Sequence, residues 1–137
     1  MGWLFNPTSL VAVKADIAAL QALVATKAAL TVAQTEVFVG ASPIAWTDLD
    51  LSGTIGANSA LVLLKFARTA AGTTYYAIRK NGDVDEFYSG AVNGCATGIG
   101  STTLWGVFLV ATDANGVIEW KSGAAVDTTI DVITYIK

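Results

Sequence analysis

The chain has 137 residues, of which 53% are hydrophobic and only 14% are charged, and its net charge is −3. Because an average soluble protein has about 25% charged residues, we expect a chain of this composition to bury extra surface between subunits. The eight Lys and Arg residues are scattered, which argues against nucleic-acid binding, since phosphate contacts need clustered basic side chains. Asp16, Gln21 and Lys27 interrupt the longest apolar run, so no membrane insertion is expected.

Residues that carry catalysis or bind metals are scarce. The chain has no histidine and a single cysteine, Cys95, which excludes Ser–His–Asp and Cys–His arrangements, His-based zinc sites and an intrachain disulfide. The carboxylates of Asp48 and Asp50, and those within residues 83–86, have a spacing that a glycosidase or a calcium site could use. The exposed side of a strand and an Asn-Gly turn explain them more simply. We therefore expect no enzyme, no cofactor and no metal.

The first third of the chain predicts a long helix. Asn6 can cap a helix that begins at Pro7, because proline fixes a helical φ and lacks the N–H that would be unpaired there, and we expect this helix to extend to about Ala33. Its apolar residues follow the three-then-four spacing of a coiled coil and predict a seam for association with other copies of the chain, without fixing their number: Leu10, Val13, Ile17, Leu20 and Val24. The alternative is a single amphipathic helix packed on its own domain.

An apolar tip, Trp3-Leu4-Phe5, precedes this helix. It either folds back on the helix or attaches the protein to a larger assembly, and we name it as the candidate attachment segment. No basic segment of a signal peptide is found near this end.

After the helix the pattern predicts strands, at Thr35–Val39, Trp46–Leu51, Ala60–Arg68, Thr73–Lys80, Val84–Tyr88, Leu104–Thr112, Val117–Lys121 and Thr128–Ile136. Asn81-Gly82 and residues 113–116 predict turns that pair the flanking strands as hairpins. Residues 52–59 are expected to be a loop. The Gly-rich segment 89–103 lacks the Gly-Lys-Ser/Thr of a phosphate loop and is expected to be a long connection. About eight strands without a further helix indicate a β-sandwich or a barrel.

Two features of these strands suggest binding surfaces. Residues 60–66 and 106–110 are apolar on both faces of their strands, which contact with a neighbouring subunit would explain. Tyr75 and Tyr76 are adjacent, as are Phe87 and Tyr88, so an aromatic platform for a sugar ring can form across the hairpin. The alternative is that one residue of each pair lies in the core and the other in a subunit interface.

An apolar tip, a short helical stalk and a Gly- and Thr-rich β-domain resemble the knob proteins of phage head fibres, tail fibres and tail needles. The similarity lies in the blocks TDLDLSGTIGANSALVLLKFA, YYAIRKNGDVDEF and FLVATDANGVIEWKSGAAVDTTIDVITYI. The resemblance implies an antiparallel jelly roll, a homotrimer, a location in the virion, and capsid or tail proteins as partners. Because no set of functional residues is shared across such fibres, none is transferred to this chain.

These observations predict an attachment tip and coiled-coil helix in residues 1–33 and a jelly-roll knob in residues 34–137. The leading hypothesis is a structural virion protein, a trimeric fibre or decoration knob that attaches through its N-terminus and either binds host-surface carbohydrate or only decorates the particle. A cellular carbohydrate-binding module without a viral role is the alternative.

Overall fold

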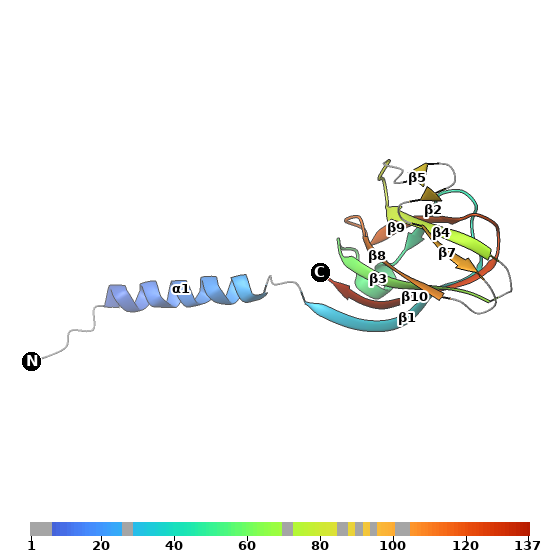
Figure 1. Ribbon diagram of the computed structural model, residues 1–137. Helices are drawn as coiled ribbons and strands as arrows, with labels where there is room; N and C mark the ends of the chain where they lie inside the picture. Colours follow the sequence, from blue (N-terminus) through green and yellow to red (C-terminus); the bar gives the residue numbers. More distant parts are fainter. Residues whose placement is uncertain are drawn as a thin grey trace, which may run out of the picture.

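The computed structural model of the chain describes residues 7–25, 29–69, 73–84, 88–89, 92–93, 96–100 and 105–137. They form an N-terminal helix and a β-sandwich (Figure 1). The helices are α1 (Pro7–Ala25) and the single turn α2 (Ser52–Ile55). The strands are β1 (Leu30–Ala41), β2 (Thr47–Asp50), β3 (Leu61–Arg68), β4 (Thr73–Lys80), β5 (Tyr88–Ser89), β6 (Val92–Asn93), β7 (Ala96–Gly100), β8 (Trp105–Ala111), β9 (Val117–Ser122) and β10 (Asp127–Ile136).

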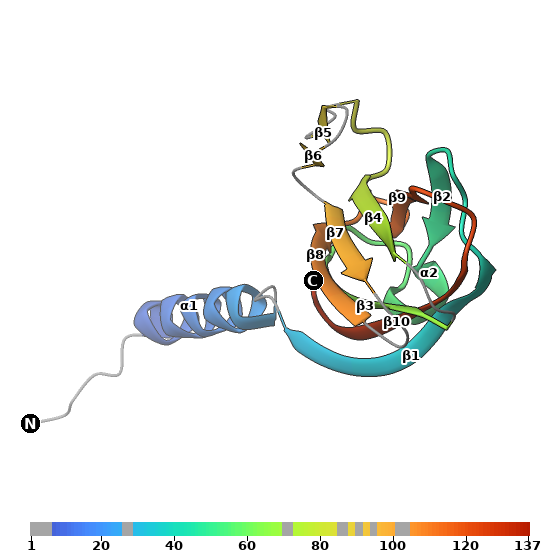
Figure 2. The ribbon, with the colours of Figure 1, turned by 45° about the vertical axis from the view of Figure 1, so that its right-hand side comes forward.

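The strands are arranged in two four-stranded antiparallel sheets. We call the sheet with the order β1-β10-β3-β8 sheet A, and the sheet with the order β2-β9-β4-β7 sheet B; β5 and β6 pair separately. Consecutive strands from β1 to β4 alternate between the sheets, as do those from β7 to β10, except that β4 and β7 are neighbours in sheet B. Figure 2 shows the two layers facing each other. The prediction of a mainly β sandwich with an N-terminal helix is confirmed.

The core lies between the sheets and is centred on Trp120, which is 1% exposed. Its ring centroid lies 4.9 Å from that of Phe38 and 5.6 Å from that of Phe66. Phe66 in turn contacts the rings of Tyr76 and Phe108, at 5.2 and 5.0 Å between centroids. These aromatic side chains come from both sheets, so one continuous cluster joins the layers.

The helix is shorter than the sequence predicted. It ends at Ala25, and residues from Leu30 onward form β1 instead of a last helical turn. Leu30 lies opposite Ile136 in the register of β1 and β10, and the N–H of Ala29 donates to the carbonyl of Lys137 at 3.1 Å. Pairing with the C-terminal strand therefore overrides the local helical pattern. The predicted terminal strand, 128–136, is confirmed as β10.

One predicted hairpin is corrected, and the partner strand of the other lies largely outside the described residues. The turn at residues 113–116 forms, with Gly116 at φ 82°, but β8 and β9 on either side of it belong to different sheets. The turn at Asn81-Gly82 also forms, yet β4 pairs with β9 and β7. The segment 89–103, expected to be a connection, contains β6 and β7, and the expected loop at 52–59 begins with α2. Both local turns were therefore predicted correctly, whereas the strand pairing across residues 113–116 was not.

Candidate functional site

Helix α1 projects from the sandwich (Figure 1) and is exposed along its whole described surface. Every side chain from Val11 to Ala22 is exposed, including Val13 at 51%, Ile17 at 50% and Leu20 at 60%. These three residues belong to the predicted seam; Leu10 and Val24 lie on the same helix, while nothing is described of their side chains. Among the described residues, no helix has the length and apolar character needed to cross a membrane. The helix therefore presents apolar side chains to water in a single copy of the chain.

The sides of α1 differ in chemistry. At 100° per residue, Lys14 and Asp16 flank the seam on either side. The opposite side carries Val11, which is 67% exposed, and five alanines, Ala12, Ala15, Ala18, Ala19 and Ala22. A surface helix of a globular protein normally has a polar side facing water. This helix has almost none, which is typical of a helix that is enclosed by partners.

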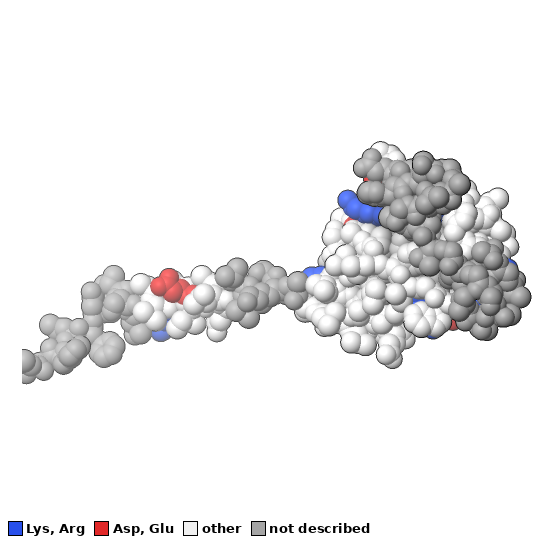
Figure 3. All heavy atoms as spheres, viewed as in Figure 1, with Lys and Arg blue, Asp and Glu red and all other residues white. Residues whose placement is uncertain are grey.

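The outer face of sheet A, the side away from the core, is also apolar. Along β8 the exposed residues Trp105, Val107 and Leu109 alternate with inward-facing ones, and Leu61 on β3 adds to them. Strands 60–66 and 106–110, predicted to be apolar on both faces, thus bury one face in the core and leave the other uncovered. In Figure 3 the described surface of the knob in view, near the base of the helix, carries few charged side chains.

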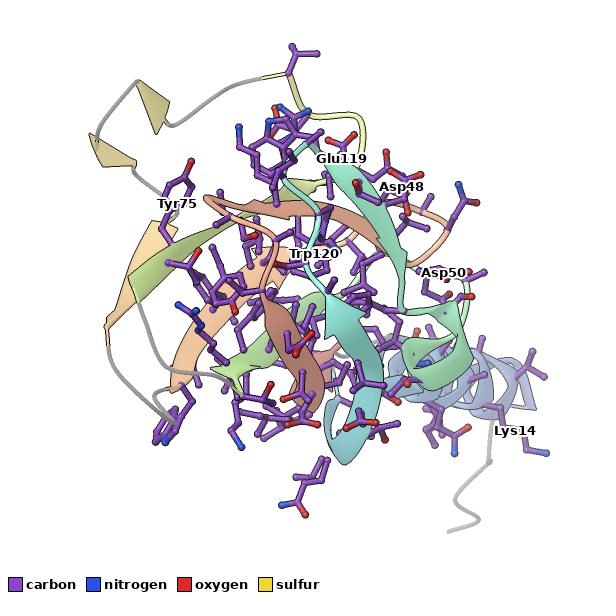
Figure 4. The ribbon with its side chains drawn as sticks, turned by 90° about the vertical axis from the view of Figure 1, so that its right-hand side faces the viewer. Lys14, Asp48, Asp50, Tyr75, Glu119 and Trp120 are labelled. Carbon is purple, nitrogen blue, oxygen red and sulfur yellow. The ribbon has the colours of Figure 1, made fainter. Side chains whose placement is uncertain are left out.

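The outer face of sheet B is polar and aromatic. Trp46, just before β2, lies partly buried against two cations: the guanidinium carbon of Arg79 is 4.1 Å and the Nζ of Lys121 is 4.5 Å from its ring centroid. Arg79 forms an ion pair with Glu119, which lies opposite Asp48 in the register of β9 and β2. Figure 4 shows Asp48 and Glu119 close together on this side. The role of Trp46 was not predicted, because its partners lie on strands far away in the sequence.

The predicted aromatic platform is divided by the sandwich. Tyr75 is half-buried on the outer face of sheet B, where its ring lies over Gly123, whereas Tyr76 is fully buried in the core. Tyr76 is therefore a core residue and not the surface ligand contact that the sequence suggested. Phe87 lies outside the described residues, as do Trp3, Leu4 and Phe5 of the tip. Tyr88 is in β5, with no described side chain.

The exposed acids have structural partners. The hydroxyl and the backbone N–H of Ser52 hold the pKa of Asp50 below its ordinary value, and the N–H lies 2.8 Å from Oδ1. The pKa of Asp113 is likewise lowered, mainly by the hydrogen bond from the backbone N–H of Val117 and further by hydrogen bonds from the backbone and side chain of Asn115. Neither carboxyl is tuned toward proton donation near neutral pH. Among the described residues, no group of three His, Cys, Asp or Glu side chains could hold a metal ion.

The most unusual surfaces of the described chain are thus two apolar ones, helix α1 and the outer face of sheet A, and not a catalytic constellation. Comparison of the chain with protein-family models, with curated proteins and with solved structures gives no match.

Proposed function

We propose that this chain is a structural protein of a virus particle, a trimeric fibre or decoration protein with α1 as its stalk and the sandwich as its knob. The observation that carries the proposal is the exposure of α1, whose seam residues Val13, Ile17 and Leu20 are each at least half exposed. A helix of 19 residues gains little stability in water from propensity alone. It needs partners, and the seam fits the same helix from other copies of the chain.

Two further observations support this assembly. The chain has 8372 Å² of accessible surface, whereas a compact monomer of 14.2 kDa has about 6,800 Å². The exposed side chains of α1 contribute to this surface, and helix association would cover part of it. The strand orders of the two sheets, in which the first and last strands are paired, support the proposal of a jelly-roll topology. The jelly roll is a common architecture of viral capsid domains.

The attachment end of the proposed fibre is its N-terminus. Trp3, Leu4 and Phe5 precede the stalk, so they would insert into a capsid or tail protein while the knob points outward. The almost uniformly apolar circumference of α1 supports an enclosed stalk base. The genes that flank this one test the virion role: structural virion genes would support it, and genes of a cellular glycan pathway would favour the cellular carbohydrate-binding module instead.

The oligomeric state tests the stalk directly. By size-exclusion chromatography with light scattering, the full chain is expected to have three times the chain mass of 14.2 kDa. Val13→Glu places a charge in the seam and is expected to shift the mass toward the monomer. Val11→Glu, the same change on the opposite side of the helix, is the matched control and should leave the trimer intact. A wild-type chain that is monomeric at all accessible concentrations would overturn the proposal.

Carbohydrate binding by the knob is a second candidate, and the outer face of sheet B favours it. Trp46 lies against Arg79 and Lys121, and Tyr75 lies farther along the same face; aromatic and charged side chains of these kinds suit sugar C–H faces and hydroxyl groups. On a glycan array, Trp46→Ala should lose the binding that the wild type shows, and Val11→Ala on α1, outside the sandwich, should retain it. If no glycan binds, the knob only decorates.

A further inference from the structure

The outer face of sheet A presents its apolar side chains in rows that run across the strands. Directly opposed residues of neighbouring strands point to the same side, so the register places Leu30, Ile136, Leu61 and Ala111 in one row. The first three are 65%, 37% and 40% exposed. The next row contains Val32 at 67% and Leu109 at 64%, with Thr134 and Leu63 between them. A contiguous apolar surface of this kind marks an interaction site.

An ion pair lies in the middle of this face. Lys65 Nζ lies 3.8 Å from Asp131 Oδ2, and the two side chains are 38% and 31% exposed. They line a hollow of about 350 Å³ together with Gln34 and Ile133. Gln34 adopts φ 49°, which few residues other than glycine do, at the irregularity in the pairing of β1 with β10. Lys65 and Asp131 compensate each other locally, whereas Glu36, which lies opposite Asp131 on the edge strand β1, adds one exposed carboxylate at the margin of this face.

The apolar rows begin where the stalk joins the knob. Strand β1 begins at Leu30, a few residues after the end of α1. The hydrogen bond from the N–H of Ala29 to the carbonyl of Lys137 holds this end of β1 beside β10. Figures 1 and 2 show α1 leading into β1 along the side of the sandwich that carries sheet A. Helices associated in one bundle have axes about 8–10 Å apart. Stalk association would therefore hold the Leu30 rows of neighbouring copies close together, at a high effective concentration.

We infer that the outer face of sheet A is the interface between the knobs, and that its occupant is a second copy of this chain, with the copies arranged around the axis of the stalk. This inference rests on the proposed trimer and adds to it the surface that the knobs share. On assembly, Trp105, Val107 and Leu109 on the edge strand β8 become covered, and the pair formed by Lys65 and Asp131 loses its water. The knob then contributes to trimer stability independently of the helix.

The first test introduces charge into the face of the full-length chain. Leu109→Glu is expected to raise the protomer concentration at half-dissociation by about 100-fold or more, since it would bury an unpaired carboxylate opposite Leu63. Val84→Glu is the matched control, because Val84 is 86% exposed and lies outside sheet A. Sedimentation equilibrium gives the dissociation constants, and circular dichroism checks the fold of each variant.

The second test uses the ion pair, and its readout is specific to a covered face. Lys65→Met leaves Asp131 unpaired, so the protomer concentration at half-dissociation is expected to rise about 100-fold if the pair is buried in the trimer. The double variant Lys65→Met/Asp131→Leu should recover most of the lost affinity. If the face stays in water, neither variant should change the dissociation constant by more than a few fold. Unchanged dissociation constants in these variants, or a Leu109→Glu chain that forms the trimer as well as the wild type, would overturn the inference. The stalk is tested separately by Val13→Glu. A monomeric wild type would instead overturn both proposals.

Discussion

A buried hydrogen bond between the two sheets offers a quantitative test of how the sandwich is held together. The hydroxyl of Tyr76, on β4 of sheet B, lies 2.7 Å from Oγ1 of Thr128, on β10 of sheet A, and the two residues are 0% and 1% exposed. The Thr128 hydroxyl also donates to the carbonyl of Val126 at 3.0 Å. Because a hydroxyl has one proton to donate, Tyr76 must be the donor and Thr128 the acceptor of the bond between the sheets.

This assignment makes the two deletions unequal. Tyr76→Phe removes the donor and leaves Thr128 bonded to Val126, so the free energy of unfolding should fall by about 0.5–1.5 kcal/mol, the net value of one hydrogen bond. Thr128→Val leaves the Tyr76 hydroxyl buried without its acceptor, and should lower the free energy of unfolding by about 1–3 kcal/mol. In that variant the carbonyl of Val126 is still satisfied, because it also accepts a hydrogen bond from the N–H of Ser42 at 2.9 Å. The double variant should resemble Tyr76→Phe alone, because no hydroxyl is then left unsatisfied.

Urea unfolding followed by tryptophan fluorescence measures these differences, at one fixed protomer concentration so that association contributes equally to each variant. Thr47→Val, at an exposed position, is the control and should stay within about 0.5 kcal/mol of the wild type. If Thr128→Val is no more destabilising than Tyr76→Phe, the donor assignment is wrong. If the two single changes simply add in the double variant, the residues are not energetically coupled.

Two other predictions concern turns. Hydrogen bonds from Val117 and Asn115 lower the pKa of Asp113, so its carboxylate stabilises the fold above its unfolded pKa of about 3.9, and this stabilisation is lost as the pH falls through the lower folded pKa. The difference in melting temperature between the wild type and Asp113→Asn should therefore become smaller from about pH 5 to pH 2. A difference that stays constant over this range would contradict the assignment. Gly82 and Gly116 have φ near 80°, but only at Gly116 would a Cβ meet backbone, the Gly56 carbonyl at 2.7 Å. Gly82→Ala should therefore cost about 1–2 kcal/mol of stability by urea unfolding, and Gly116→Ala clearly more; equal losses would show that the close approach is unimportant.

Local signals in the sequence predicted the elements well, and the pairing of strands less well. The turn residues 113–116 specify a reversal of the chain, because Gly116 needs a positive φ and Asp113 accepts from two backbone N–H groups. They do not specify whether the next strand pairs with the previous one or crosses to the other sheet. That choice depends on which strand edges remain free after β10 has paired with both β1 and β3, and it is a property of the whole fold.

The same limit applies to the candidate surfaces. The doubly apolar character of residues 60–66 and 106–110 is visible in the sequence, because a strand alternates between two faces and both faces were apolar. The cluster around Trp46 is not visible, since Arg79 and Lys121 meet its ring only after β4 and β9 have paired in sheet B. Tyr76 could not be assigned to the core from its sequence neighbours, because Tyr75 has the same chemistry and only the pleat distinguishes them.

The topology of the sandwich connects its two apolar surfaces. Because β1 lies beside β10 at the edge of sheet A, the stalk necessarily joins the knob on the side of this sheet. The charged and aromatic residues Asp48, Glu119, Arg79 and Trp46 lie on the opposite side, on or beside sheet B. Copies of the chain that associate through α1 would therefore bring their apolar faces inward and leave their polar faces in water. The helix alone offers a short seam and sheet A alone offers a single layer, so in the proposed trimer the two surfaces would add to each other's contribution to stability.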